Sequence, residues 1–487
     1  MPYWEVAESF IKEYGVVKQH IDSYNELISN RLPRIMENYP EIETNKENCY
    51  IKFHSIRLEK PIAVEADGSR KQILPMDCRL RNKTYAAAVY SEIGIFDGEK
   101  EIDKDEVLIG KFPVMLKSNL CYLSEMNEEQ LIKANEDPLD QGGYFIINGS
   151  EKSLVSIENP VSNRIMLATE NKSGKTLYTS TVFSHSMYRA GGKNAVQRTE
   201  EGFLYVIHPG SPNNLNLTVL LKALGLESDQ KVINAFSEKA KNDVLLNLEK
   251  TPVKNKEEAL DYIGKRLAAS QSEEYRKKRA EYVIDHYLLP HIGTEPENRL
   301  TKAYFLVRMA ERTIEGARGE RKVDDRDHYA NKRMKISGPL LEDIFNLAIS
   351  AFARDLRYQV DRAYTRRRKL QVKTLVRPDT FTTRVLHAMA TGNWVGNRTG
   401  VSQLLDRHSY AVAISQMRRV STPLSQTHAH YEARDVHPTT FGKICPVETP
   451  EGHRVGLQKH LATGCVISSR LVENVEDELK KLGVKSK

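Results

Sequence analysis

The sequence contains 487 residues, with 72 lysines and arginines against 65 aspartates and glutamates, and its formal net charge is +7. Apolar residues make up 40% and charged residues 28%, a balance that excludes wholesale disorder and fibrous repeats. A chain of this length predicts about three domains. No apolar run is long enough to predict a membrane span, and the first residues do not form a secretory signal. The five cysteines form no CxxC pair, which predicts neither a zinc ribbon nor a disulfide framework and favours a reducing, cytoplasmic location.

The first part of the chain combines a helical segment with β-rich segments. Over residues 4–30, apolar side chains recur every three or four positions, which predicts a helix, and Pro33 is expected to limit the next segment. Residues 50–110 hold short apolar runs between turn residues, which predicts strands. Within 143–157, the pair Asn148-Gly149 separates two short runs and predicts a hairpin.

From residue 159 to about 335 the pattern changes. Two strand-like pieces, Phe203–His208 and Leu217–Leu221, lead into charged segments that are typical of solvated helices, one of them over 272–289. A long helix is expected from about 339 to 369. Its predicted core-facing residues are Leu341, Phe345, Ala348, Phe352 and Leu356.

Several clusters allow a functional and a structural interpretation. Arg366–Lys369 suits either the end of a solvated helix or a phosphate contact, and both remain open. Ser173–Thr176 resembles the end of a phosphate-binding loop, but Thr169 stands where the motif needs glycine, so a turn is favoured. Asp324, Asp325 and Asp327 alternate with cations, which favours an ion-pair network over a Mg²⁺ site. His428, His430 and His437 lack a zinc-protease pattern, so a polar loop is favoured over a metal site.

The stretch 398–459 carries the strongest signal of nucleic-acid chemistry. Its cations alternate with amide and hydroxyl side chains, and they are Arg398, Arg407, Arg418, Arg419, Arg434, Lys443, Arg454 and Lys459. Arginine offers a planar fork of donors to phosphate, and amides and hydroxyls can bind sugars and base edges. Two proline-containing loops, at Thr422-Pro423 and Thr449-Pro450, lie among the cations and limit the ordering cost of contact with a polymer.

This stretch resembles the fork region of the second-largest, β-like subunit of multisubunit DNA-directed RNA polymerases. The resemblance rests on RTGVSQLLDR, MRRVSTPLS and ARDVHPTTFGKICPVETPEG, and segments such as FPVMLKSNLCYL, GGYFIINGSEKSLVSIE and DDRDHYANKR agree with it in order. It covers nearly the whole chain, and GGYFIINGSEK is archaeal or eukaryotic in style. The resembled subunit is more than twice as long, so the chain is similar to the N-terminal polypeptide, called B'', of the split subunit that some archaea make.

The resemblance implies a domain arrangement and a fold. Residues 1–158 and 336–393 would form the protrusion, 159–335 an inserted lobe, 394–467 the fork, and 468–487 a tail leading to the missing half. The fold class would be multidomain α+β, without a Rossmann-type sheet.

The resemblance also implies a role without catalysis by this chain. In this family two Mg²⁺ ions, held mainly by the largest subunit, carry out nucleotidyl transfer. This chain would bind no cofactor or metal of its own and would line the DNA cleft. Its expected nucleic-acid contacts are Gln403, Arg418, Arg419, Arg434, Lys443 and Glu451 in the fork, and Asn331, Lys332 and Arg333 on the lobe side. For each of them, a structural ion pair is the alternative.

The expected partners are implied by the same resemblance. They are the C-terminal half of the β-like subunit (B'), the largest and the other core subunits, template DNA, nascent RNA and general transcription factors, with no membrane. A stand-alone nucleic-acid-binding module is the alternative function, supported by the arginine-rich stretch alone.

Overall fold

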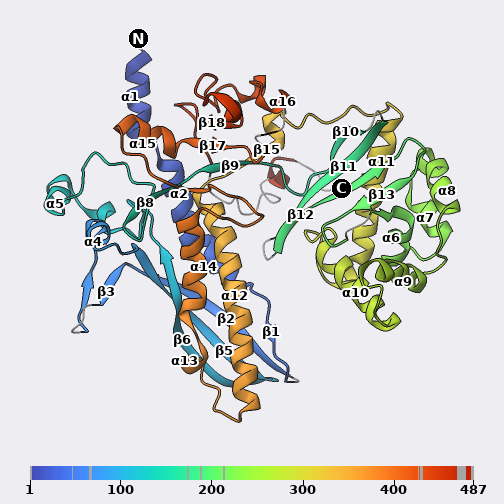
Figure 1. Ribbon diagram of the computed structural model, residues 1–487, viewed down its shortest axis with the longest axis horizontal. Helices are drawn as coiled ribbons and strands as arrows, with labels where there is room; N and C mark the ends of the chain where they lie inside the picture. Colours follow the sequence, from blue (N-terminus) through green and yellow to red (C-terminus); the bar gives the residue numbers. More distant parts are fainter. Residues whose placement is uncertain are drawn as a thin grey trace. The chain divides into compact units, whose positions relative to one another are not determined.

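The computed structural model describes residues 3–46, 48–64, 68–172, 175–186, 189–211, 214–425, 427, 431–468 and 479–483. The chain divides into two compact units: unit 1 comprises Met1–Asn159 and Met334–Lys487, and unit 2 comprises Pro160–Arg333. Unit 2 is therefore inserted into the sequence of unit 1 (Figure 1). Helices and strands are mixed throughout, which confirms the predicted α+β class. The finer division into protrusion, lobe and fork stays a prediction.

The largest sheet of unit 1 is antiparallel, in the order β1-β2-β5-β6. Its strands are β1 (Ile42–Glu43), β2 (Cys49–Glu59), β5 (Ala86–Asp97) and β6 (Lys100–Pro113). Burial alternates along β2, as expected of a sheet with one face on the core. A two-residue turn with Gly98 at φ +63° joins β5 to β6, and β3 (Ile62–Val64) pairs separately with β4 (Arg70–Gln72).

Two long helices pack together and against this sheet, α12 (Ser337–Thr365) and α14 (Pro378–Thr391), as Figure 1 shows. The predicted apolar stripe of α12 is fully buried. The Phe345 ring lies 6.1 Å from that of Phe112 on β6 and 5.5 Å from that of Phe381 on α14. At Gly110 on β6, a Cβ would lie 2.5 Å from Cδ1 of Phe381, so only glycine allows this approach. The helix ends at Thr365, short of the predicted 369, because Arg367 takes φ +52°.

The N-terminal helix is interrupted, which corrects the expectation of one helix over 4–30. The segment contains α1 (Tyr3–Tyr14), α2 (Lys18–Glu26), a π-helical turn (Leu27–Arg31) and α3 (Leu32–Glu37). Gly15 takes φ +62° between α1 and α2, a conformation that glycine adopts without strain. Pro33 does not stop the helix, because it lies in the first turn of α3, where proline is tolerated.

The remaining elements of unit 1 are short. The predicted hairpin is confirmed: β7 (Phe145–Ile147) and β8 (Ser150–Leu154) are joined by Asn148 and Gly149, which both have positive φ. A second small sheet has the order β15-β9-β17-β18, with β15 (Lys332–Lys335), β9 (Ser156–Pro160), β17 (Arg419–Ser421) and β18 (Gln458–His460). The other elements are α4 (Pro75–Leu80), α5 (Glu128–Lys133), α13 (Val372–Leu375), β16 (Ser402–Leu404), α15 (Tyr410–Met417) and α16 (Tyr431–Arg434), and β15 lies at the boundary to unit 2.

Unit 2 has an antiparallel sheet and its own apolar core. The strands are β10 (Met166–Lys172), β11 (Lys175–Ser186), β12 (Arg189–Arg198), β13 (Leu204–Ile207) and β14 (Leu215–Asn216). The helices are α6 (Leu217–Ala223), α7 (Asp229–Ala235), α8 (Lys241–Glu249), α9 (Lys256–Leu267), α10 (Glu273–Tyr287) and α11 (Arg299–Ala317). The predicted strand Leu217–Leu221 is wrong: it belongs to α6, and all seven residues of this helix are buried, so no polar face revealed the helical period.

Candidate nucleic-acid interface

Gln403 and Arg419, on different elements of the fork-side segment, meet through their side chains. Gln403 lies on β16, which pairs antiparallel with β8 so that Gln403 opposes Ser153. Arg419 begins β17, immediately after α15, whose first turn is capped by the Ser409 hydroxyl. Nη1 of Arg419 donates to Oε1 of Gln403 at 3.3 Å, and Nε2 of Gln403 donates to the Gly400 carbonyl at 2.9 Å. The amide of Gln403 thus orients the guanidinium.

Arg419 is a half-buried cation without an anionic neighbour in contact. Its Nε is buried and has no acceptor among the described residues, and no described carboxylate lies within 4.0 Å of the guanidinium. Burial and, after it, the nearby positive charge of Arg454 lower the pKa of Arg419. The carboxylates of Glu448 and Asp406 act in the opposite sense but do not pair with the guanidinium, and a guanidinium that has lost water without a contacting anion is costly. Arg454 is exposed, so the two arginines form an anion-binding candidate open to solvent.

Arg418, the neighbour of Arg419, has a different environment. Its Nη1 donates to the Val16 carbonyl at 2.7 Å and its Nη2 to the Ala462 carbonyl at 2.6 Å. Burial lowers the pKa of Arg418. Because its donors are taken up by backbone oxygens, this predicted contact residue joins two segments of unit 1, and an additional contact with nucleic acid stays a prediction.

Arg434 holds the loop that carries Glu451 and Arg454. Its Nη1 donates to the carbonyls of His453 at 3.0 Å and Val455 at 2.8 Å. The loop is also closed by Thr449, whose hydroxyl accepts from the Gly456 amide at 2.9 Å. These bonds to backbone oxygens replace the ion pair with Asp435 or Glu432 that was the alternative on sequence grounds. Arg434 therefore positions Arg454.

Two further predicted residues, Lys443 and Glu451, are exposed, and both are close in sequence to Arg454. Nζ of Lys443 donates to the Thr439 carbonyl at 3.1 Å. Glu451 is exposed and precedes the 3₁₀ turn Gly452–Arg454. A carboxylate at this place repels phosphate, so Glu451 fits a contact with a base edge or sugar hydroxyl better than one with the backbone.

Asn331, Lys332 and Arg333 are the last residues of unit 2, and Lys332 and Arg333 begin β15. Nζ of Lys332 lies 3.0 Å from Oδ1 of Asp327. Arg333 donates through Nη1 to the carbonyls of Ala330 and Lys332, at 3.0 and 2.8 Å. Nδ2 of Asn331 donates to the Asp325 carbonyl at 2.7 Å. The acidic cluster thus forms the network of ion pairs and hydrogen bonds that its interleaved cations indicated.

A second charged network joins Arg407 to the β7–β8 hairpin, and the sequence did not reveal it. Arg407 bonds Glu151 at 2.7 Å and Asp140 at 3.0 Å, and Arg79 bonds the same Glu151 at 2.9 Å. Burial raises the pKa of Asp140, but bonds from the Gly142 amide, the Tyr144 hydroxyl and Arg407 outweigh it and lower the pKa overall. Partners more than 250 residues apart cannot be paired from their spacing.

The remaining candidates give no second site. Ser173, Gly174, His428 and His430 lie outside the described residues, and His437 bonds the Thr439 hydroxyl at 2.7 Å. Across the part of the chain that the structure describes, no three His, Cys, Asp or Glu residues gather as a metal site would require. Searching the same residues finds no helix with the length and apolarity needed to cross a bilayer.

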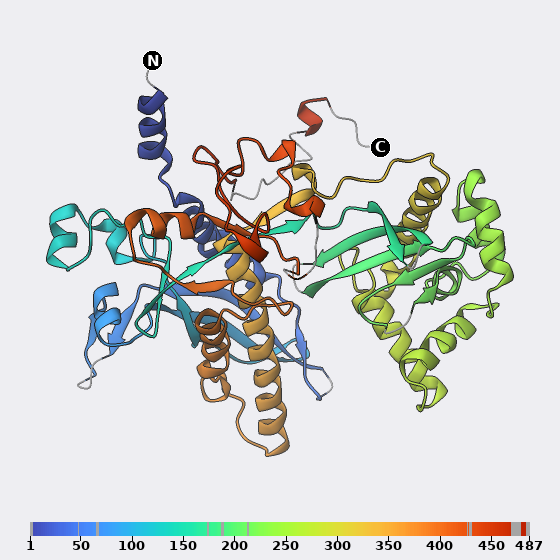
Figure 2. The same cartoon turned by 45° about the horizontal axis from the view of Figure 1, so that its top comes forward.

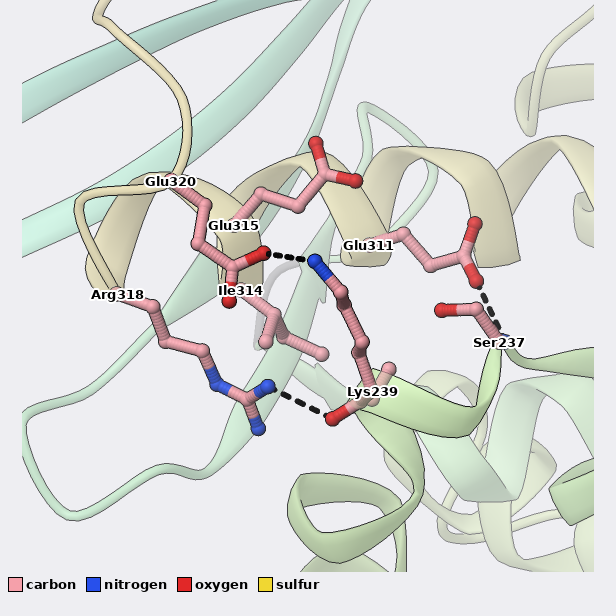
Figure 3. Close-up of a pocket in the computed structure, with 8 residues that line it drawn as sticks. Ser237, Lys239, Glu311, Ile314, Glu315, Arg318 and Glu320 are labelled. Atoms are coloured by element: carbon pink, nitrogen blue, oxygen red, sulfur yellow. Dashed lines mark hydrogen bonds and ion pairs between the residues drawn. The ribbon is translucent and has the colours of Figure 1, made fainter.

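A surface hollow on unit 2 lies between the turn around Lys239 and helix α11 (Figure 3). Lys239 binds Glu320 at 3.1 Å, the Ser237 amide donates to Glu311 at 2.7 Å, and Arg318 donates to the Lys239 carbonyl at 2.7 Å. The polar groups that line the hollow bind one another across it. The hollow is therefore a packing contact between the turn around Lys239 and helix α11.

Comparison with known proteins agrees with this geometry. A family described as RNA polymerase beta subunit matches residues 15–383, and one described as RNA polymerase Rpb2, domain 3, matches residues 403–467. The chain belongs to the RNA polymerase β-subunit family. The second match contains Gln403, Arg419 and Arg454, so the anion-binding candidate lies within a domain type of this family.

Relatives in archaea share almost the full length of the chain. It is 43% identical to the DNA-directed RNA polymerase subunit Rpo2N of Methanococcus vannielii, with 98% of each chain covered. It is 42% identical to Rpo2N of Methanothermobacter thermautotrophicus, with 99% of this chain and 98% of the relative covered. It is 40% identical to Rpo2 of Saccharolobus solfataricus, where the match covers 99% of this chain and only 43% of the relative. The chain is thus similar to the N-terminal half of an archaeal β-like subunit.

Proposed function

We propose that this chain is the N-terminal, B''-type half of the β-like subunit of a DNA-directed RNA polymerase in the archaeal cytoplasm. In this proposal its fork-side surface holds nucleic acid near the active centre. The observation that carries the contact is the half-buried guanidinium of Arg419, oriented by Gln403, with a buried Nε that has no acceptor among the described residues. A backbone phosphate supplies the missing negative charge and acceptor.

The residues of this chain bind and position, and they do not carry out the chemical step. Arg419 and Arg454 bind the sugar-phosphate backbone, Gln403 fixes the plane of the Arg419 guanidinium, and Arg434 fixes the loop that carries Arg454. The two Mg²⁺ ions supply Lewis-acid chemistry when bound, and the proposal assigns them mainly to the largest subunit. Lys443, Glu451, Asn331, Lys332 and Arg333 are further proposed contacts.

The proposed assembly includes the C-terminal half of the β-like subunit, the largest and other core subunits, template DNA, nascent RNA and general transcription factors. The names and the near-complete coverage of the Rpo2N relatives support the split arrangement. They do not favour the stand-alone nucleic-acid-binding module, because those relatives are polymerase subunits.

The test uses the reconstituted polymerase on a template–RNA scaffold, with Arg419→Ala and Arg454→Ala singly and together. Each removed phosphate contact should weaken scaffold binding about tenfold and reduce the slope of log K against log salt by about one. The exposed Arg384 on α14 provides a matched control, because Arg384→Ala removes the same charge from another element of unit 1.

The outcomes separate the two parts of the proposal. An unchanged salt slope in the double variant would remove Arg419 and Arg454 from the interface. Failure of the wild-type chain to enter a polymerase, together with scaffold binding by the chain alone, would instead favour the stand-alone module.

A further inference from the structure

Helix α1 presents an apolar face that no part of the described chain covers. None of its 12 residues is buried. The side chains of Tyr3, Trp4 and Val6 are 93%, 71% and 62% exposed. Figures 1 and 2 both show α1 extending away from the sheet and the long helices of unit 1.

The exposed apolar residues of α1 share one side of the helix. At 100° per residue, the apolar positions cover one continuous arc. They are Tyr3, Trp4, Val6, Ala7, Phe10, Ile11 and Tyr14. The opposite arc is polar, with Glu5, Glu8, Ser9, Lys12 and Glu13, and Lys12 pairs with Glu8 at 2.8 Å. Lys18 lies over the Tyr14 ring at the C-terminal end of α1, at 5.7 Å from its centroid, while Tyr3, Trp4 and Val6 stay exposed. A clean division of this kind indicates a surface that is covered in the assembled protein.

The base of α1 is held beside the segment that leads toward the second half of the subunit. Arg418 donates to the Val16 carbonyl, two residues after α1, and to the Ala462 carbonyl. The backbone carbonyl of Arg418 also accepts from the Leu461 amide at 3.1 Å. One residue thus ties the start of the chain to the strand that precedes residues 463–468.

The single-chain relative identifies the polypeptide that continues beyond this segment. In Rpo2 of Saccharolobus solfataricus the match covers 43% of the protein, so more than half of that polypeptide is joined covalently to the equivalent of this chain. The segment after Ala462 and the base of α1 meet at Arg418, and a 12-residue helix is only about 18 Å long. The segment that leads toward the remainder of the β-like subunit in the single-chain relative therefore passes beside the base of α1.

We propose that the apolar face of α1 docks on an apolar surface of the C-terminal half of the β-like subunit and helps hold the two polypeptides together. This inference rests on the proposed function. Arg418 is a positioning residue for this interface, because it fixes where α1 starts relative to the segment that enters the second half.

The experiment uses the complete reconstituted polymerase and a photo-crosslinking amino acid at position 4 or at position 9 of the chain. Trp4 lies on the apolar arc and Ser9 on the polar arc of the same helix. Position 4 should crosslink to the C-terminal half, and position 9 should give at least about tenfold less of this product. Crosslinking of position 4 to another subunit, to a second copy of this chain or to nothing would overturn the inference.

A competition assay measures what the face contributes to assembly. Differently isotope-labelled wild-type and variant chains compete for entry into limiting amounts of the other subunits. Trp4→Ala with Ile11→Ala should reduce incorporation to about one-tenth, since truncated anchors cost about tenfold or more in binding. The control, Glu5→Ala with Lys12→Ala, has the same spacing on the polar arc and should compete equally with wild type.

Alanine favours the helical conformation, so α1 should stay helical in both double variants. A defect that only the apolar variant shows therefore does not come from unfolding of α1. Equal incorporation of the two double variants would contradict the docking role. If the wild-type chain itself does not enter the polymerase, the proposed function fails. Entry of the wild-type chain without any effect of the α1 variants overturns only the inference about α1.

Discussion

The turn at 325–333 in unit 2 and the fork-side segment 403–459 in unit 1 both carry closely spaced cations, and the two regions neutralise them differently. In the turn, Lys332 pairs with Asp327 and Arg333 binds two backbone carbonyls. In the segment 403–459, Arg419 keeps a buried donor without an acceptor among the described residues, and the charge of Arg454 lowers its pKa while Glu448 and Asp406 raise it. The difference shows that the local partners of a cation, more than the density of cations, identify a candidate binding surface.

Arg418 and Arg419 show the same contrast between adjacent residues. Arg418 uses its donors on backbone carbonyls, whereas Arg419 has one amide partner at 3.3 Å. The two arginines are adjacent in the sequence and carry the same charge, so the sequence does not distinguish their roles. We therefore expect substitutions to separate residues that stabilise the fold from those that bind a partner.

The largest expected effect is a loss of stability at acid pH, and each of the two units should show it. Burial lowers the pKa of His20 in unit 1 to about 4, although the hydrogen bond of its ring to the Met417 carbonyl opposes this shift, and burial lowers the pKa of His208 in unit 2 to about 4. Between pH 6.5 and 4 the unfolded chain binds more protons than the folded chain, so stability falls as the pH falls. Each histidine should cost up to about 3 kcal/mol by pH 4.

Segment-resolved hydrogen exchange of the chain between pH 7 and 4.5 measures this loss separately in the two units. In His20→Gln the pH dependence of opening should decrease around α2 and remain around β13, next to His208. The same pH dependence of α2 opening in the variant and in wild type would show that His20 is not the responsible group.

Arg418→Ala should lower the free energy of unfolding by about 2 kcal/mol, because it removes the donor of the Val16 carbonyl and one of two donors of the Ala462 carbonyl, which also accepts from the Cys465 amide. Chemical denaturation of the purified chain measures the effect. Arg418→Lys serves as a control that retains the charge but not the fork of donors, and it should recover only part of the loss. A full recovery by lysine would mean that charge, and not the two directed bonds, stabilises this junction.

Arg434→Ala should slow elongation by the reconstituted polymerase about fivefold, equivalent to about 1 kcal/mol, while the thermal midpoint of the chain stays near that of wild type. The reason is that the loop carrying Arg454 loses its bonds to His453 and Val455. If Arg434 only positions the loop, the salt dependence of elongation is unchanged. A salt slope that falls by about one would assign it a direct nucleic-acid contact, as the sequence resemblance predicts.

The smallest effect is expected in the turn of unit 2. Lys332→Ala should lower the free energy of unfolding by about 0.5 kcal/mol, because it removes one partly exposed ion pair with Asp327. Thermal unfolding of Lys332→Ala, Asp327→Ala and the double variant gives the coupling energy of the pair. If Lys332 also contacts nucleic acid, Lys332→Ala, unlike Asp327→Ala, should reduce the salt slope of scaffold binding.

Some secondary-structure elements could be predicted from their local sequence, and others could not. The hairpin at Asn148-Gly149 was predicted because both residues accept the positive φ that its turn requires. The buried face of α12 was predicted from its helical period. Helix α6 was mistaken for a strand, since a short, fully buried helix has no polar side to reveal its period.

The candidate site shows the same limit. The family resemblance led to Gln403 and Arg419, but nothing in the sequence distinguished Arg419 from Arg418. The difference depends on a contact between Arg418 and Val16, which are 402 positions apart. Arg454 was recognised only as one cation of many, and its role as the neighbour of Arg419 depends on the loop that Arg434 holds.

The insertion of unit 2 into unit 1 has a consequence for synthesis on the ribosome. The β1-β2-β5-β6 sheet is complete in the nascent chain before unit 2, whereas α12 and α14, which cover its apolar face, come after it. At about 5–20 residues per second, the roughly 220 residues between Pro113 and Ser337 take about 11–45 s to be made. During that interval Phe53 lacks the ring of Phe352, and Phe112 lacks the ring of Phe345. Chaperone demand should therefore peak while unit 2 is being translated and fall once α14 has emerged.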